Sequence, residues 1–315
     1  MSSPAITNEP AREASLHSGG AARTRALYEG VIQWVLWVCA GVSVLTTLGI
    51  VLVLMVESLQ FFREVSLVEF LTSTQWSPTF RDKHYGILPL FCGTLLVTGG
   101  AILIAAPIGL GTAIYLSEYA SPGVRETVKP LLEVLAGIPS VVYGVVAVTT
   151  ISPIIKTWFG AQSIYNAASA SIVVGFMILP MIVSLSEDVL RSVPRALREA
   201  AFALGATKFD VTVKVIVPAA LSGIVASVLL AVSRAIGETM AVTLAAGAQP
   251  NLTLNPLESV QTMTAYIVQI SSGDAPSGSP EYKAIFAVGM TLFITTMTLN
   301  VLAQWIIRRM REQYE

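Results

Sequence analysis

The sequence predicts an all-α membrane protein with six transmembrane helices. Of its 315 residues, 54% are hydrophobic and only 12% are charged, whereas roughly a quarter of the residues are charged in ordinary soluble domains. The apolar residues also fall into runs of about 20 or more, the length that a helix needs to cross a bilayer. A formal net charge of −1 argues against nucleic-acid binding, which requires a basic face.

Six apolar runs define the expected membrane spans. They cover residues 31–56, 88–114, 131–155, 167–185, 219–246 and 284–307. The chain organisation predicted from these runs is a disordered tail (1–26), an N-terminal transmembrane helix (27–60), an external loop (61–87), a five-helix core (88–307) that includes a polar loop (187–218), and a short C-terminus (308–315).

The orientation in the membrane follows from the distribution of lysine and arginine between the loops, because cytoplasmic loops carry the excess. Thirteen of the 19 basic residues fall in the tail, the loops after the second and fourth spans, and the C-terminus, while five fall on the opposite side. Both termini and the polar loop 187–218 are therefore predicted to be cytoplasmic. The protein is expected to be a multi-pass membrane protein.

The polar loop is predicted to form a short helix, a sharp bend and a second helix. Ser192 and Pro194 mark the start of the first helix, and Gly205 has the position of a C-terminal glycine. Thr207 and Asp210 then have capping-box spacing ahead of an apolar run.

The first of these helices has two unlike faces. Its apolar face is predicted to hold Leu197, Ala200, Ala201 and Leu204, and its exposed face Arg195, Arg198, Glu199 and Phe202. An aromatic residue among charges favours a docking surface, because aromatic and arginine side chains dominate interface energetics. The alternative is an amphipathic helix lying against lipid headgroups.

Arg234 and Glu238 are charged residues inside the fifth predicted span. Charges at the centre of a span cost about 2.5–3.5 kcal/mol each on insertion scales, and they commonly mark a substrate path. At positions i and i+4 of a helix the two side chains share one face and can neutralise each other. The pair is either a structural ion pair or a cation and its counter-ion on the path of a transported anion, for which the planar fork of arginine is suited.

The string EAAFALGATKFDVTVKVIVP, residues 199–218, resembles the EAA motif of bacterial ABC-importer permeases. Glu199, Ala200, Ala201 and Gly205 match the motif fully, and residues 215–218 fill its Ile-x-Leu-Pro end conservatively. The resemblance implies a type I importer permease (MetI-like) fold with six spans. It also implies that Arg198, Glu199, Ala200, Ala201, Phe202 and Gly205 belong to a coupling helix that docks on a cytoplasmic ABC ATPase homodimer. The location that it implies is a bacterial inner membrane.

A narrower resemblance covers almost the whole chain beyond the tail. The segments YLSEYA (115–120), AGIPSVVYG (136–144) and RAIGETMAV (234–242) are similar to the membrane subunits of the high-affinity phosphate ABC transporter, and the first external loop favours the C-type subunit over its A-type paralogue. This resemblance implies a pseudo-symmetric heterodimer with the A-type permease, an external phosphate-binding protein, and inorganic phosphate as the substrate.

Other functions remain open from the sequence alone. No Gly-x-x-x-x-Gly-Lys-Ser/Thr loop occurs, so ATP hydrolysis is expected from a partner chain, and no cofactor, metal site or catalytic residue is predicted. The alternatives are a permease of the same fold for another oxyanion such as sulfate or molybdate, a stand-alone secondary transporter or channel, and a membrane scaffold without transport.

Overall fold

The computed structural model describes residues 10–78, 82–274, 276 and 278–310, with side chains from Tyr28 to Arg309 within these ranges. The chain divides into two compact units at Val56/Glu57. The first unit contains most of α1 (Pro10–Glu64), whose long apolar stretch begins at Tyr28. The tail predicted over residues 1–26 is therefore helical from Pro10 onward, where Ala, Arg and Glu are good helix formers; residues 1–9 lie outside the described residues.

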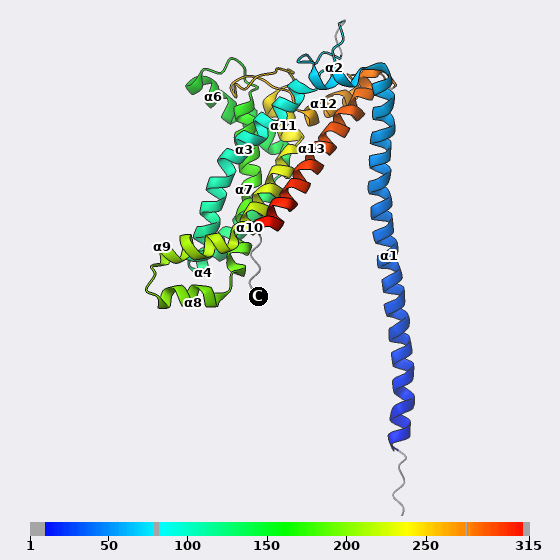
Figure 1. Ribbon diagram of the computed structural model, residues 1–315, viewed down its shortest axis with the longest axis vertical. Coiled ribbons are helices and arrows are strands. Elements are labelled where there is room, and N and C mark those ends of the chain that lie inside the picture. The colour runs from blue at the N-terminus through cyan, green and yellow to red at the C-terminus, as the bar shows by residue number, and fades with distance from the viewer. Residues whose placement is uncertain (1–9, 79–81, 275, 277, 311–315) are drawn as a thin grey trace, which may run out of the picture. The chain divides into compact units, whose positions relative to one another are not determined.

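The second unit, Glu57–Glu315, contains the helical core (Figure 1). After the end of α1, its elements in chain order are α2 (Leu67–Thr72), α3 (Leu88–Ile114), η1 (Tyr115–Tyr119), α4 (Pro122–Gly137), α5 (Ser140–Val146), η2 (Ala147–Ile151), α6 (Ser152–Phe159), α7 (Ala167–Ser192), α8 (Arg195–Ala203), α9 (Lys208–Val211), η3 (Thr212–Ile216), α10 (Val217–Ile236), α11 (Met240–Ala246), α12 (Met263–Gln269), η4 (Ile270–Asp274) and α13 (Pro280–Met310). The η elements are π-helical turns.

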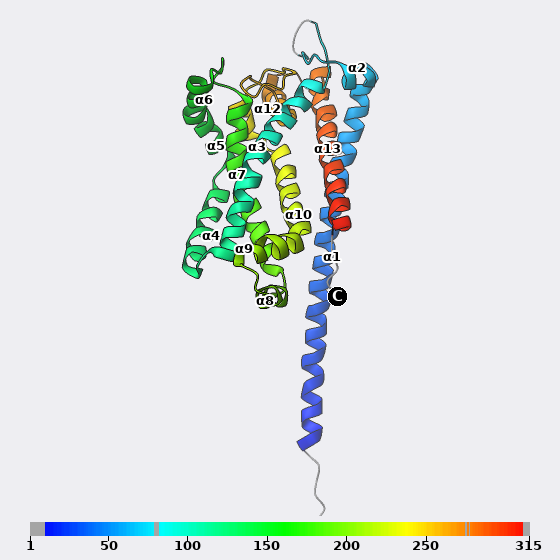
Figure 2. The same ribbon diagram turned by 60° about the vertical axis from the view of Figure 1, so that its left-hand side comes forward.

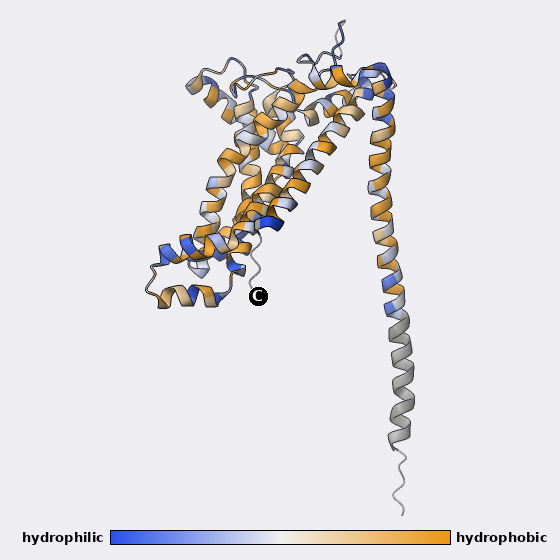
Figure 3. Ribbon diagram, in the orientation of Figure 1, coloured by the Kyte–Doolittle hydropathy of each residue, from blue (hydrophilic) through white to orange (hydrophobic). Residues whose placement is uncertain are grey.

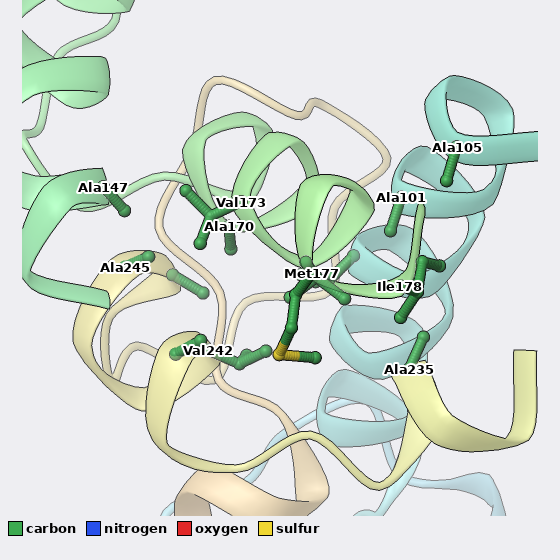
Figure 4. Close-up of a cluster of buried hydrophobic side chains, with 14 of the residues drawn as sticks. Ala101, Ala105, Ala147, Ala170, Val173, Met177, Ile178, Ala235, Val242 and Ala245 are labelled. Atoms are coloured by element: carbon green, nitrogen blue, oxygen red, sulfur yellow. The ribbon is translucent and has the colours of Figure 1, made fainter. Parts of the chain in front are cut away.

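The centre of this unit is a close packing of α3, α7, α10 and α11. Alanines from these helices face one cluster, among them Ala101, Ala170, Ala235 and Ala245 (Figure 4). Small residues let helix backbones approach closely, which is the main way that membrane helices gain packing energy. The contact between α3 and α7 is so close that a Cβ at Gly100 would lie 2.5 Å from the Ser171 hydroxyl.

Two further clusters close the ends of the unit. One combines the end of α1 with α2, α12 and the start of α13, and it is rich in aromatic rings such as Phe61, Trp76 and Tyr266. The other joins the ends of α3 and α7 to the start of α10. Figure 2 confirms that α8 and α9 lie at one end of the unit and that α6 and α12 lie at the opposite end.

The described residues include six helices that are long and apolar enough to cross a membrane. They are Tyr28–Glu64, Leu88–Tyr119, Ser140–Phe159, Ala167–Ser192, Lys208–Ile236 and Pro280–Arg309. Figure 3 shows the apolar colour along α3, α7 and α10 and polar residues on α8 and at the end of α13. The predicted all-α class with six spans is confirmed.

The predicted boundaries of the third and fifth spans are wrong. The third span was expected at 131–155, but α4 ends at Gly137 and the long helix begins at Ser140. Pro139 forces the preceding Ile138 into an extended conformation (φ −67°, ψ 128°), which separates the two helices.

The fifth span was expected at 219–246, whereas the observed helix starts at Lys208 and ends at Ile236. Gly237 and Thr239 then leave the helical path, and α11 begins at Met240. The apolar run hides this break because hydropathy records composition and not backbone hydrogen bonds.

Tyr85 is buried in the aromatic cluster at the end of α1. Its ring lies 5.4 Å from that of Phe61 between centroids, and its buried hydroxyl has no hydrogen-bond partner among the described residues. Burial, together with the nearby Glu281, Glu64 and Glu69 carboxylates, raises the pKa of Tyr85 from 10.0 to about 12. Between pH 10 and 12 the unfolded chain releases this proton and the folded chain does not, so stability falls as the pH rises through that window.

Replacing Tyr85 with Phe keeps the ring and removes the unpaired hydroxyl. We expect Tyr85→Phe to stabilise the detergent-solubilised protein by about 1 kcal/mol at neutral pH and to reduce the loss of stability between pH 10 and 12. Thermal unfolding across this pH range measures both effects, with Tyr28→Phe, at an exposed tyrosine, as the control. An alkaline loss in Tyr85→Phe as large as in the wild type would contradict the prediction.

Candidate functional site

Arg234 and Glu238 meet at the break between α10 and α11. Arg234 Nη1 lies 3.2 Å from Glu238 Oε2. Glu238 is 3% exposed, and its other carboxylate oxygen accepts a hydrogen bond from the Ala241 amide at 3.3 Å. The predicted pair is therefore present, but it is not formed along one continuous helix: Glu238 lies past the end of α10 and caps the start of α11.

The two partners of this pair have unequal exposure. The Glu238 backbone carbonyl accepts a hydrogen bond from the Thr264 hydroxyl at 2.8 Å, which holds the residue in place. The Arg234 side chain is 53% exposed and makes one contact to the carboxylate. Since a guanidinium has five N–H donors, Arg234 keeps donors available for a ligand.

Arg234 lines a cavity of about 680 Å³ between α4, α5, α7 and the end of α10. This volume falls within the range of small-molecule sites, roughly 300–1,000 Å³. The polar side chains in its wall include Lys129, Glu133, Ser140, Ser184 and Glu187. The break at Ile138–Pro139 also borders the cavity, so both interrupted helices contribute to it.

Glu187 is fully buried in the wall of this cavity and is surrounded by cations. Its carboxylate lies 3.3 Å from Arg125 Nε and 3.5 Å from Arg191 Nη1, and it also forms an ion pair with Lys129. These contacts join α4 to the end of α7. The sequence gives Glu187 no evident role. Its i, i+4 spacing from Arg191 is visible there, but its burial and the cations from α4 arise from tertiary packing.

Removing the Glu187 charge tests whether it holds α4 and α7 together. Glu187→Gln leaves three cations without their shared carboxylate, so we expect a loss of about 3 kcal/mol in stability. Thermal unfolding in detergent measures it. The matched control is Asp188→Asn: Asp188 also contacts Lys129 (3.5 Å) but is exposed, so its loss should stay below about 1 kcal/mol. Equal losses in the two variants would contradict this role.

The predicted helix–bend–helix element is present as α8, the bend and α9. Gly205 has a φ of +80°, the left-handed conformation that glycine adopts most readily. The Thr207 hydroxyl accepts a hydrogen bond from the Asp210 amide at 3.2 Å, which confirms the predicted cap. The bend is therefore built by the residues that predicted it.

The predicted faces of α8 are partly wrong. Leu197 and Ala201 pack inward as expected, and Glu199 and Phe202 are exposed as expected. Leu204, however, is 90% exposed. It lies at the C-cap with a ψ of 3°, so it no longer follows the helical periodicity that placed it on the apolar face.

Two residues of the expected coupling helix, Ala200 and Arg198, also lie on the opposite face from the one predicted. Ala200 was expected on the apolar face but is exposed, as are Glu199, Phe202 and Gly205. Arg198 is turned inward and its side chain is 22% exposed. The prediction that Arg198 lies on the exposed face was wrong, because the nearly buried Glu118 carboxylate in η1 attracts its guanidinium. The coupling set and the Arg234–Glu238 pair thus lie on separate elements.

These features define a helical membrane protein in which interrupted spans surround a charged cavity and a bent amphipathic helix projects at one end. Solved structures show the same fold. A chain of a bacterial ABC transporter involved in the import of alginate matches at 17% identity with a TM-score of 0.64, covering 91% of this chain and 99% of that chain. A chain of the MetNI methionine ABC transporter matches at 17% identity with a TM-score of 0.54, covering 72% and 95%.

Sequence comparison gives the family. Residues 105–312 match the family of the binding-protein-dependent transport system inner membrane component, and the chain belongs to this family. It is 35% identical to the probable ABC transporter permease protein YqgH of Bacillus subtilis (91% of this chain, 93% of the relative). It is also 32% identical to the phosphate transport system permease protein PstC of Mesorhizobium japonicum (76% and 78%) and 31% identical to PstC 1 of Mycobacterium tuberculosis (88% and 92%). The chain is therefore a multi-pass membrane permease of the ABC importer type.

Proposed function

We propose that this chain is a C-type permease subunit that moves inorganic phosphate into the cell. The observation that carries the proposal is Arg234, a half-exposed guanidinium in a cavity of about 680 Å³ that also borders the helix break at Ile138–Pro139. The relatives described as phosphate transport system permeases support the choice of phosphate.

Arg234 would bind the anion, and Glu238 would control its availability. A phosphate oxygen pair matches the two parallel N–H donors of a guanidinium. Glu238 occupies one edge of Arg234 when no anion is bound, so the incoming phosphate competes with the carboxylate, and the carboxylate re-forms the ion pair when phosphate leaves. This exchange keeps the arginine paired in both states, and the Ala241 amide, 3.3 Å from Glu238 Oε1, remains to stabilise the released carboxylate.

The proposed transporter contains several other chains. A cytoplasmic ABC ATPase homodimer would dock on α8, a homologous A-type permease would supply a second cation to the path, and an external phosphate-binding protein would deliver the substrate. The excess of basic residues on the side of α8 supports a cytoplasmic location for this end and for both termini in a bacterial inner membrane. ATP hydrolysis would be the work of the partner ATPase alone.

Substitution of Arg234 tests the substrate role. Arg234→Gln should reduce phosphate uptake into proteoliposomes at least 100-fold, and Arg234→Lys should keep a small part of it, because lysine retains the charge without the planar fork. Lys156→Gln, which removes an exposed charge on α6, is the control. Uptake at the wild-type rate in Arg234→Gln would show that the Arg234–Glu238 pair has only a structural role. Stronger uptake of sulfate than of phosphate by the wild type would contradict the assignment of phosphate as the substrate.

The exposed side chains at the end of α8 test the docking of the ATPase. Phe202 is 48% exposed and Leu204 is 90% exposed, and large apolar side chains of this kind become the energetic centre of an interface when covered. We expect Phe202→Ala and Leu204→Ser each to lower the amount of ATPase that co-purifies with the permease about tenfold or more. Phe159→Ala, at an exposed phenylalanine on α6, is the control; full recovery of the ATPase with both α8 variants would contradict the docking role.

A further inference from the structure

Arg198 connects α8 to the body of the protein. Its Nη2 atom donates a hydrogen bond to the Leu190 carbonyl oxygen at 2.7 Å and lies 3.2 Å from Glu118 Oε1. Arg195, one turn earlier on the same helix, is exposed. Since Arg198 is held on the inner side of α8, it is not part of the outward surface that contains Phe202.

Glu118 receives this arginine in η1, the π-helical turn that follows α3. It is 9% exposed, and its Oε1 atom also accepts a hydrogen bond from the Ser117 hydroxyl at 2.8 Å. Turns of this type are frequent at functional sites. Separating the pair would leave a nearly buried carboxylate without its cation, which is strongly unfavourable, so the contact holds α8 firmly against η1.

The same turn contacts α4 and, through it, the cavity. Arg125 on α4 donates from Nε to the Leu116 carbonyl at 3.1 Å and from Nη2 to the Ser117 carbonyl at 3.2 Å. Arg125 Nε also lies 3.3 Å from Glu187, which lines the cavity. A continuous series of polar contacts therefore leads from α8 through η1 and α4 to the cavity wall.

The helix after the bend, α9, also contacts η1. Lys208, at the start of α9, lies over the Tyr119 ring with Nζ 4.9 Å from the ring centroid. Apolar contacts of α8, such as those of Leu197, are non-directional and allow sliding. A charge-assisted contact with a defined geometry resists it, so the polar contacts are the ones suited to transmit a displacement.

We infer that Arg198 and Glu118 form a positioning pair that transmits the movement of α8 to η1, α4 and the cavity. In this assignment Arg198 acts within the permease and does not contact the ATPase. The inference rests on the proposed function, because it takes α8 to be the helix on which the ATPase docks. It deepens that function by separating the residues that bind the ATPase from those that carry its movement inward.

Charge reversal in the complete transporter tests the pair. The variants are Arg198→Glu, Glu118→Arg and the double reversal, reconstituted with the ATPase, the second permease and the binding protein. Lys156→Glu is the control, since it reverses a charge at an exposed position on α6, at the end of the unit opposite α8 (Figure 2). Co-purification of the ATPase reports docking, and ATP hydrolysis stimulated by the binding protein reports transmission.

We expect each single reversal to lower the stimulated hydrolysis at least tenfold while the ATPase still co-purifies at the wild-type ratio. The double reversal should restore hydrolysis to within about threefold of the wild type, and Lys156→Glu should change it less than twofold. If a single reversal does not yield an assembled complex, Arg198→Gln, which removes the charge without placing two carboxylates together, is judged by the same criteria.

Two results would overturn the inference. Loss of the co-purifying ATPase in Arg198→Glu and Arg198→Gln, without recovery in the double reversal, would place Arg198 in the docking surface. Unchanged hydrolysis in both single reversals would make the pair dispensable. The co-purification result does not depend on the substrate. Failure of the wild type to take up phosphate would overturn the proposed function, while retention or loss of the ATPase in the Arg198 variants still decides whether Arg198 belongs to the docking surface.

Discussion

A carboxylate buried at the end of a membrane helix must be neutralised by its neighbours, and Glu187 imposes this constraint on the structure. Its three cations come from α4 and from the last turn of α7. No residue of α4 is buried, so apolar packing alone does not account for the position of this helix. The charge cluster supplies the directional contacts that hold α4 beside α7 and thereby closes one side of the cavity.

The two helix breaks have a common physical basis. Backbone groups that leave a helix within a membrane must be hydrogen-bonded by the protein or must face a water-filled space. The break at Ile138–Pro139 borders the cavity. The break after Ile236 adjoins the Arg234–Glu238 ion pair. The second break also resolves the cost of Arg234 in a span, because it places the guanidinium in an open cavity and its counter-ion at the start of the next helix.

The helix–bend–helix element of α8 and α9 exposes some of its side chains and holds others against the body of the protein. Phe202 and Leu204 face outward, where a partner can cover them, and Arg198 faces inward to the nearly buried Glu118. The bend at Gly205 separates α8 from α9 without a strained non-glycine residue. A short helix with few apolar contacts of its own thus remains attached to the protein by charge and stays exposed on its other side.

The sequence by itself determined the all-α class, the six apolar spans, the bent element with its glycine and threonine caps, and the Arg234–Glu238 pair, because hydropathy, capping and charge within a span are local properties. It did not determine the inward turn of Arg198, the exposure of Leu204, the burial of Glu187 or the break after Ile236. Each of these depends on which groups from distant segments meet: Glu118 attracts Arg198, Arg125 and Lys129 neutralise Glu187, and the Ala241 amide and Thr264 hydroxyl hold Glu238. Only the tertiary structure brings these partners together, and a buried charge takes its position from its partners.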